Sequence, residues 1–258
     1  MFPLVIAHRG ASAEAPENTL RAFARALALG VDGIELDVQV TRDGVAVVFH
    51  DSSLMRLTGT RGRIADRTWA ELQKLRVGGE PIPTLADALA LTRKQAILQI
   101  EIKKGVPVAP VLAAIRRTAS SGQVILASFE SDILRQVAVL APKLPRMLIA
   151  NLGQASRPLN TLLRQGFGGH GTKAAKGAKV DPSAMKLLQT MAAVGASGIS
   201  VCHEAITTPP FVETIHRRGA QLWCWTVNDV SNMRRLRDYA VDAILTNDPA
   251  KLLKVLRT

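Results

Sequence analysis

Short apolar runs alternate with segments of helical periodicity along nearly the whole chain. After the first run, apolar residues recur at helical spacing over residues 20–28, where Asn18 or Thr19 can cap a helix and Gly30 can end it. The same rhythm continues to the last residues. It predicts strands at 4–7, 33–40, 97–102, 124–127, 146–150, 198–201, 222–225 and 243–245, and helices at 20–28, 85–92, 108–118, 131–140, 183–194, 210–218, 231–239 and from 249 onward.

Strands that alternate with helices favour a parallel sheet, and eight such units in one chain favour a closed barrel. We therefore predict the α/β class and a (β/α)8 TIM barrel. An open, doubly wound sheet is the alternative, but neither a glycine-rich dinucleotide fingerprint nor a lysine-containing phosphate loop supports it. The 258 residues, 47% of them hydrophobic, suffice for one large core, so we expect residues 1–258 to form a single domain.

One turn signal falls inside this pattern. Asp43-Gly44 separates the end of one strand, residues 38–41, from a further apolar run at 45–49. Such a dipeptide between apolar runs predicts a hairpin. The hairpin would bring His50 back toward the strand that precedes the turn.

Two segments break the alternation. Residues 52–83 are rich in glycine and proline, and they predict a small insertion after the third apolar run, with one short helix near 69–75. Residues 166–182 are rich in glycine and lysine and lack apolar periodicity. We expect a mobile loop there.

Charged residues lie on one face of two predicted strands. Glu35 and Asp37 alternate with apolar neighbours on one strand, and Glu101 does so on another, with Lys103 just beyond it. Helices cover the outside of a barrel, so these side chains should point into its upper end, where active sites lie. A solvated strand face would be the interpretation in an antiparallel protein, but it conflicts with the helices that follow these strands.

Three inward carboxylates would be costly to bury without a counter-charge. Glu35, Asp37 and Glu101 offer only oxygen ligands. Oxygen ligands suit a hard cation, so we predict Mg²⁺ or Ca²⁺, and Mn²⁺ is compatible with the same set. No cysteine accompanies the cluster, which makes zinc less suitable.

His8 and His50 each follow an apolar run. A lone histidine at a strand end is more often structural, but two beside the same carboxylates favour acid/base chemistry. Arg9 and Lys103 are natural contacts for phosphate oxygens. The other histidines are predicted in a loop, on a helix surface, and at a strand end from which the site could be lined: His170, His216 and His203, respectively.

The chain is basic. It carries 33 Lys+Arg against 21 Asp+Glu, a net charge of +12, with a pI of about 10.4. This charge suits phosphorylated metabolites, nucleic acid or acidic lipid, and equally a generally basic surface. Cys202 and Cys224 lie in apolar runs, which predicts buried free thiols. The first residues show no signal-peptide pattern and no apolar run is long enough to span a membrane, so we expect a cytoplasmic protein.

Several motifs resemble those of the glycerophosphodiester phosphodiesterase family. They occur in the family's order and span nearly the whole chain: AHRGAS, PENTL, GIELDVQVTRDGVAVVFHD, GRIADRTWAEL, IPTLADAL, QIEIK, LASF, WCWTVND and ILTNDP. The resemblance implies a (β/α)8 barrel with a small inserted segment after the HD motif, at about residues 52–83.

Roles follow from the resemblance by matching position. The acid/base pair would be His8 and His50, and the divalent-metal ligands would be Glu35, Asp37 and Glu101. The phosphate-contacting residues would be Arg9 and Lys103; Asn18 would line the site and Trp225 would pack at its mouth. Each of these positions carries the residue type that the family motif expects, whereas the stretch 166–182 departs from the family's usual spacing.

We therefore predict an enzyme, a glycerophosphodiester phosphodiesterase, that hydrolyses glycerophosphodiesters such as glycerophosphocholine to glycerol 3-phosphate and an alcohol. A divalent cation and two histidines would carry the chemistry. The sequence leaves open the metal, the head group, which histidine is the acid, and whether water attacks directly or a cyclic phosphate forms first. The partner would be a small phosphodiester, with no nucleic acid and no stable membrane insertion. The oligomeric state stays open.

Two other functions are compatible with parts of the pattern. A lysophospholipase D would need an apolar trough for an acyl chain, and Leu54, Met55, Leu57 and Trp69 are scattered rather than aligned in a stripe. A non-catalytic barrel that binds polyanions would use the net charge of +12. It would have no need for two histidines beside three carboxylates.

Overall fold

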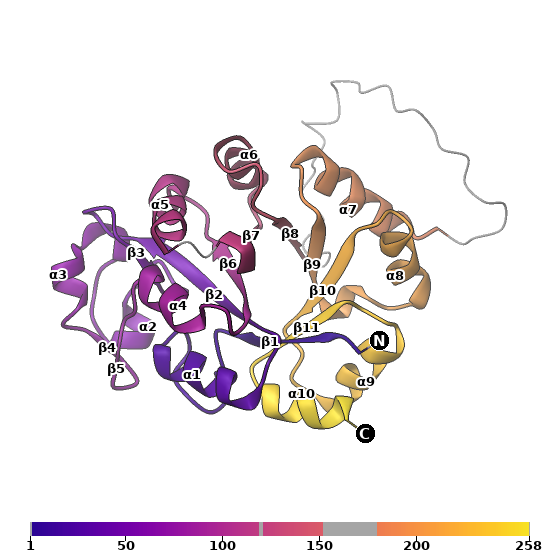
Figure 1. The fold of residues 1–258 in the computed structure, drawn as a ribbon, viewed down its shortest axis with the longest axis horizontal. Helices are drawn as coiled ribbons and strands as arrows, with labels where there is room; N and C mark the ends of the chain where they lie inside the picture. The colour runs from indigo at the N-terminus through magenta and orange to yellow at the C-terminus, as the bar shows by residue number, and fades with distance from the viewer. Residues whose placement is uncertain (1, 119–120, 152–179, 258) are drawn as a thin grey trace.

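The structure is a computed structural model that describes residues 2–118, 121–151 and 180–257. Its main sheet contains eight parallel strands, and it closes because the first of them pairs with both the second and the last. The strands follow one another around the barrel in chain order (Figure 1). They are β1 (Leu4–His8), β2 (Gly33–Val40), β6 (Ile97–Ile102), β7 (Val124–Ser128), β8 (Arg146–Ala150), β9 (Gly198–Cys202), β10 (Gln221–Trp225) and β11 (Ala243–Thr246). The predicted (β/α)8 TIM barrel is confirmed.

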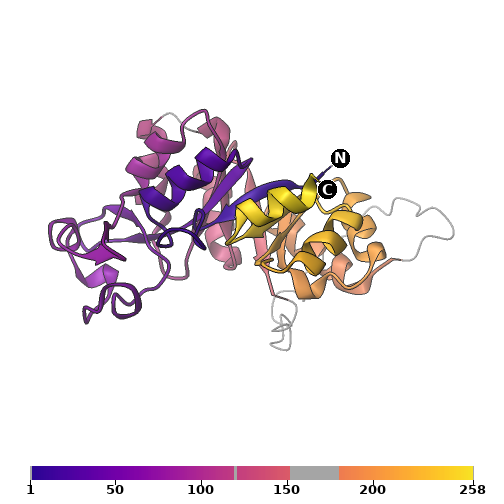
Figure 2. The ribbon, with the colours of Figure 1, turned by 90° about the horizontal axis from the view of Figure 1, so that it is seen from below.

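Helices surround this barrel (Figures 1 and 2). They are α1 (Leu20–Leu29), α4 (Leu85–Thr92), α5 (Val108–Thr118), α6 (Ser131–Leu140), α7 (Pro182–Ala193), α8 (Pro209–His216), α9 (Val230–Asp238) and α10 (Pro249–Leu256). The ends of α1 show why the boundaries follow the sequence. The hydroxyl of Thr19 accepts the backbone N–H of Ala22, and Gly30 ends the helix in the left-handed conformation, at φ 76°.

The barrel strands separate two apolar layers. Their outward side chains, such as Ile34 and Leu36 on β2, pack with the helices in the largest hydrophobic cluster. Their inward side chains form a smaller apolar cluster inside the barrel: Ile6, Ala127, Met147, Ile149, Trp223, Ala243 and Leu245. Farther along the strands, the register pairs His8 with Glu35 and Asp37 with Glu101. The polar inward positions therefore gather near the carboxyl ends of the strands, as predicted.

The predicted hairpin after β2 is present. β3 (Ala46–Val48) runs antiparallel to β2 and pairs Val48 with Val38. The turn is held by Thr41, whose hydroxyl donates to Asp43 over 2.6 Å and accepts the N–H of Val45 over 2.9 Å. Because β3 runs back along β2, His50 comes next to the carboxylates on that strand.

The insertion at 52–83 contains more regular structure than the one short helix predicted for it. The helix near the predicted position is α3 (Trp69–Leu72), and the insertion adds α2 (Met55–Thr58), a 3-10 turn η1 (Ile64–Asp66) and the two-stranded pair β4 (Arg76–Val77) and β5 (Glu80–Pro81). These elements lie together at one end of the molecule (Figure 2). A hydrophobic cluster of their own holds them to β3: Val47, Phe49, Leu54, Ile64, Leu72, Val77 and Ile82. Single turns were not predicted because each is too short for a helical period to recur.

Other predictions from the sequence concern the two cysteines, the loop at 166–182 and membrane-spanning segments. Cys224 is a buried free thiol as predicted, but Cys202 is a free thiol that is only partly buried, because it ends β9 beside Glu204. Most of the predicted loop 166–182, including His170, lies outside the described residues. The loop's described residues, 180–182, lead into α7. Among the described helices, none combines the length and apolar character needed to cross a membrane.

Candidate active site

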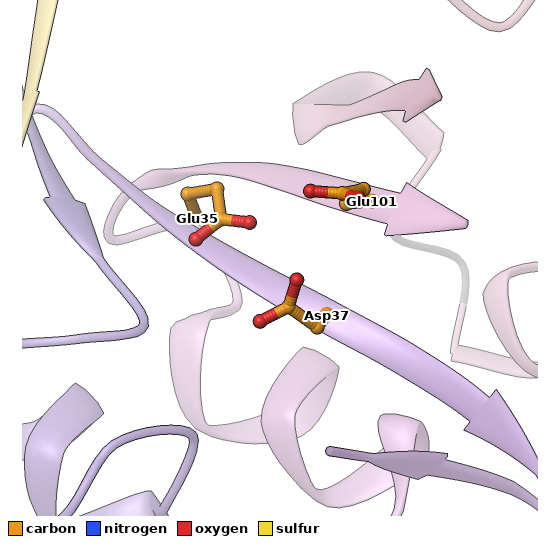
Figure 3. Close-up of side chains that lie close together, drawn as sticks. All are labelled: Glu35, Asp37 and Glu101. Atoms are coloured by element: carbon orange, nitrogen blue, oxygen red, sulfur yellow. The ribbon is translucent and has the colours of Figure 1, made fainter. Parts of the chain in front are cut away.

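Three carboxylates form the most buried part of the site. Glu35 and Asp37 come from β2, and Glu101 comes from the neighbouring strand β6. One oxygen of each lies within 4.8 Å of the others, and the residues are only 3%, 1% and 8% exposed. Figure 3 shows the three side chains turned toward one another. They face inward because alternate residues of a strand point to the same side.

The surroundings of these carboxylates shift their pKa values in different directions. Burial raises the pKa of Glu35 well above its usual value, and the charges of Asp37 and Glu101 raise it further. Burial and Asp37 likewise raise the pKa of Glu101. Burial acts on Asp37 in the same sense, but Lys103 and Arg9 outweigh it and bring the pKa of Asp37 to about 2.

Two basic side chains compensate part of this charge. Lys103 lies with its Nζ 2.7 Å from Oδ1 of Asp37 and 2.6 Å from Oε1 of Glu101. Arg9 lies with its Nε 3.2 Å from Oδ2 of Asp37, and its backbone N–H donates to Oε2 of Glu35 over 3.1 Å. Arg9 has a φ of 58°, and a Cβ on the next residue, Gly10, would meet Ala22 at 2.7 Å. The close approach of the α1 helix therefore requires glycine there.

His8 and His50 both line the pocket above the carboxylates. The Nδ1 of His8 lies 2.7 Å from Oδ1 of Asn247, and its Nε2 lies 3.8 Å from Oε2 of Glu35. Burial and the nearby Arg9 lower the pKa of His8 to about 4, so its ring is neutral at neutral pH.

His50 is held both at its ring and at its backbone. Its Nδ1 lies 2.6 Å from Oδ1 of Asp51, and its backbone carbonyl accepts the side-chain amide of Gln39 over 3.2 Å. A carboxylate can only accept, so Nδ1 carries the shared proton when Asp51 is ionised. That leaves Nε2 as the nitrogen free to exchange a proton with a ligand.

The pocket is charged on one side and mostly apolar on the other. It is lined by His8, Arg9, Glu35, His50, Gln99, Glu101, Lys103, Phe129, Ile149, Ser200, Trp225, Thr226 and Leu245. Trp225 lies at this wall, with its ring edge-to-face against Phe129 at 5.8 Å. His203 does not line the pocket; it begins the 3-10 turn η4 (His203–Ala205) after β9.

Asn18 lies behind the carboxylates rather than at the pocket surface. Its side-chain amide donates to Oδ2 of Asp37 over 2.8 Å, and its Oδ1 accepts the backbone N–H of Asp37 over 3.3 Å. The residue is 2% exposed and has a φ of 59°, a conformation that asparagine tolerates better than most residues. Its contacts are those of a residue that orients Asp37.

Four residues that were not predicted from the sequence belong to the polar contacts around the site: Glu17, Asp51, Arg56 and Asn247. Asp51 and Asn247 hold the two histidines, and Glu17 holds Arg9 over 2.9 Å. Three of them lie inside the motifs PENTL, HD and TNDP, so position next to a candidate could have flagged them. Arg56 gives no such signal.

The donor set fits a divalent cation. Among the residues that the structure describes, the three carboxylates share the space with two basic side chains, Arg9 and Lys103, and Arg9 also pairs with Glu17. Burial first, and then the charge of the neighbouring carboxylates, raise the pKa of Glu35 and Glu101 despite the nearby Arg9 and Lys103. A hard cation would compensate the carboxylate charge through oxygen ligands.

Comparison with known proteins places this site in a family. The sequence model of the glycerophosphoryl diester phosphodiesterase family matches residues 8–251. The glycerophosphodiester phosphodiesterase of Caldanaerobacter subterraneus subsp. tengcongensis is 34% identical over 100% of this chain and 99% of its own length. A putative glycerophosphodiester phosphodiesterase of Bacillus subtilis is 31% identical over 97% of this chain and 96% of its own.

Solved structures agree with the sequence matches. A putative glycerophosphoryl diester phosphodiesterase from Silicibacter pomeroyi superposes with a TM-score of 0.83 at 28% identity, over 99% of this chain and 93% of that one. A phosphodiesterase of Oleispira antarctica, solved with its product sn-glycerol-3-phosphate, gives 0.82 at 25% identity, over 100% and 98%. The chain therefore belongs to the glycerophosphoryl diester phosphodiesterase family and is an enzyme of that class.

Proposed function

We propose that this enzyme is a metal-dependent hydrolase that cleaves glycerophosphodiesters, such as glycerophosphocholine, to glycerol 3-phosphate and an alcohol. One observation carries the proposal: three buried carboxylates meet within 4.8 Å in a pocket that two histidines and two basic side chains also line or border. Family membership supplies the reaction class, and this geometry supports the chemistry.

Glu35, Asp37 and Glu101 would hold the cation, which when bound supplies positive charge for the phosphate as negative charge develops on it. Arg9 and Lys103 reach the same pocket and would bind the remaining phosphate oxygens. Mg²⁺ and Ca²⁺ suit the oxygen ligands best, and Mn²⁺ is compatible with them.

His8 and His50 would act as the acid/base pair. One removes a proton from the attacking oxygen, and the other donates a proton to the oxygen that leaves with the alcohol. Each ring has its Nδ1 next to a fixed oxygen, of Asn247 or Asp51, so each presents Nε2 for this exchange. The attacking oxygen can belong to water or to a glycerol hydroxyl that first closes a cyclic phosphate.

The small-molecule substrate is supported by the product seen in the Oleispira antarctica relative. A lysophospholipase D activity finds less support. Leu54 is fully buried in the cluster of the insertion, and Leu57 and Trp69 pack against that cluster, so they do not form an apolar trough. We treat residues 1–258 as one catalytic domain; the cytoplasmic location and the lack of a nucleic-acid partner stay predictions from the sequence.

The test is a turnover assay with glycerophosphocholine and added Mg²⁺, Ca²⁺ or Mn²⁺, with glycerol 3-phosphate and choline both measured. We expect equal release of the two products and no activity after dialysis against a chelator. Lysophosphatidylcholine, assayed in parallel, tests for the alternative lysophospholipase D activity. Release of phosphocholine in place of glycerol 3-phosphate would contradict the proposed bond cleavage.

A further inference from the structure

Arg56 joins two carboxylates near the pocket, those of Asp51 and Glu17. It lies on α2, in the insertion, and its guanidinium forms two pairs of hydrogen bonds. Nε and Nη2 donate to Asp51 over 2.6 and 2.9 Å. Nη1 and Nη2 donate to Glu17 over 3.0 and 2.9 Å. Both are the forked contacts that arginine makes with planar carboxylates, and such contacts fix direction as well as distance.

Each of these carboxylates also holds a side chain of the pocket. Asp51 Oδ1 lies 2.6 Å from Nδ1 of His50, and Glu17 Oε1 accepts from Nη1 of Arg9 over 2.9 Å. A continuous chain of polar contacts therefore runs from His50 through Asp51, Arg56 and Glu17 to Arg9.

We propose that Arg56 is a positioning residue, which fixes the imidazole of His50 and the guanidinium of Arg9 relative to each other by bridging Asp51 and Glu17. This inference rests on the proposed function, because it assigns both side chains to the reaction. Arg56 itself does not line the pocket. It acts through the two carboxylates.

The surroundings of Arg56 favour a role in orienting other side chains over a role in stabilising the fold. Its side chain is 47% exposed, and ion pairs with so exposed a partner contribute little to folding. The backbone that presents it is firmly anchored, since Leu54 is fully buried in the cluster that also contains Phe49. Phe49 directly precedes His50, so the same apolar cluster fixes the histidine and the arginine. The insertion thereby becomes part of the active site rather than a surface elaboration.

The test compares Arg56→Gln and Arg56→Lys with a matched control, Arg67→Gln. Arg67 lies in the same insertion, is similarly exposed at 40%, and pairs with Glu71 rather than with the site. We expect Arg56→Gln to lower kcat by about 10- to 100-fold, the usual effect of losing a partner that orients a reacting group. Arg56→Lys should stay close to Arg56→Gln, because lysine lacks the fork. Arg67→Gln should keep the kcat of the parent.

Chemical rescue separates positioning from a general loss of structure. The exposed place left in Arg56→Ala should admit methylguanidinium, which restores part of kcat, whereas ammonium at the same ionic strength should not. A kcat of Arg56→Gln equal to the parent's would overturn the proposal. So would equal losses of kcat in Arg56→Gln and Arg67→Gln, since that marks a general effect on the insertion.

A second readout does not depend on turnover. Protein labelled with ¹⁵N-histidine reports the ring state of His50 by NMR, with assignment from the His50→Gln spectrum. We expect Arg56→Ala to move the His50 ring signals and to leave those of His216, which pairs with Asp242, unchanged. Unmoved His50 signals would overturn the proposal. If the parent releases no glycerol 3-phosphate, the proposed function fails, and these signals alone decide for or against the positioning role.

Discussion

Nζ of Lys103 lies 2.7 Å from Oδ1 of Asp37, the most buried of the three carboxylates. The same nitrogen lies 2.6 Å from Glu101. Burial opposes the charge on Lys103, but Asp37 and Glu101 together raise its pKa, so it is an ammonium at neutral pH. A bound cation and Lys103 would therefore draw on the same carboxylate charge.

This relationship predicts that the lysine and the metal site can be separated experimentally. Lys103→Gln removes a positive charge that competes for Asp37 and Glu101, so the affinity for Mg²⁺ should not fall and should rise if the competition is strong. Turnover should nevertheless drop, because a contact to the phosphate is lost. Calorimetric titration with Mg²⁺ measures the affinity, and steady-state kinetics on the same preparation measure the turnover. A loss of Mg²⁺ affinity in Lys103→Gln would contradict the competition.

Removing carboxylate charge should weaken the metal site itself. Glu35→Gln and Asp37→Asn replace ionised ligands with neutral amides, so both should bind divalent cations more weakly. A chelator should abolish the activity of the parent. The increase in melting temperature on adding Mg²⁺ provides a measurement that needs no turnover. Full activity in excess chelator would remove these residues from the proposed role.

The stabilisation by metal should depend on pH. Glu35 and Glu101 have pKa values raised above 4.5 in the metal-free site, so they take up protons as the pH falls toward that value from above. A cation requires both groups ionised and must then displace these protons. We expect the shift in melting temperature caused by Mg²⁺ to be large at pH 7.5 and to shrink at pH 5. An equal shift at both values would mean that these carboxylates do not bind the ion.

The two histidines should be interdependent. His8→Ala and His50→Ala should each lower kcat by roughly 10²- to 10⁴-fold, the range for a lost general acid or base. The double variant should lose much less than the product of the two, because groups that act together are not additive. His216→Ala is the control, since His216 lies on α8 and pairs with Asp242 outside the pocket. A single variant that keeps the kcat of the parent would show that its histidine is structural.

The sequence predicted the parts of this fold that repeat. Eight strands and eight helices lie within a few residues of their expected positions, because most of the strands are short apolar runs and the helices carry two or more turns of apolar periodicity. The inward faces of β2 and β6 were predicted as well, because helices cover the outside of a parallel barrel and the polar side chains of its strands then point to the inside. The carboxylates therefore meet where the sequence alone places them.

What the sequence did not reveal depends on contacts between segments far apart in the chain. Arg56 is 39 residues from Glu17, and Asn247 is 239 residues from His8. No periodicity connects such pairs, and a four-residue helix such as α2 is too short to show one. Asn18 illustrates the same limit: its position in PENTL predicts a residue near the site, but only the fold shows that it holds Asp37 from behind.

The double hydrogen bond between Asn18 and Asp37 should contribute to both stability and metal binding. Asn18→Ala removes one contact to the buried carboxylate and leaves the backbone N–H of Asp37 without its partner, a loss of about 1–3 kcal/mol in the free energy of unfolding. Alanine also strains the left-handed backbone at φ 59°, by about 1–2 kcal/mol. Asn18→Gly loses the same hydrogen bonds and carries little of that strain, so it should be the more stable variant. Urea unfolding measures this difference, and Mg²⁺ titration of Asn18→Gly should show weaker binding, because Asp37 is no longer oriented. If Asn18→Gly matches the parent in both measurements, the two hydrogen bonds do not orient Asp37.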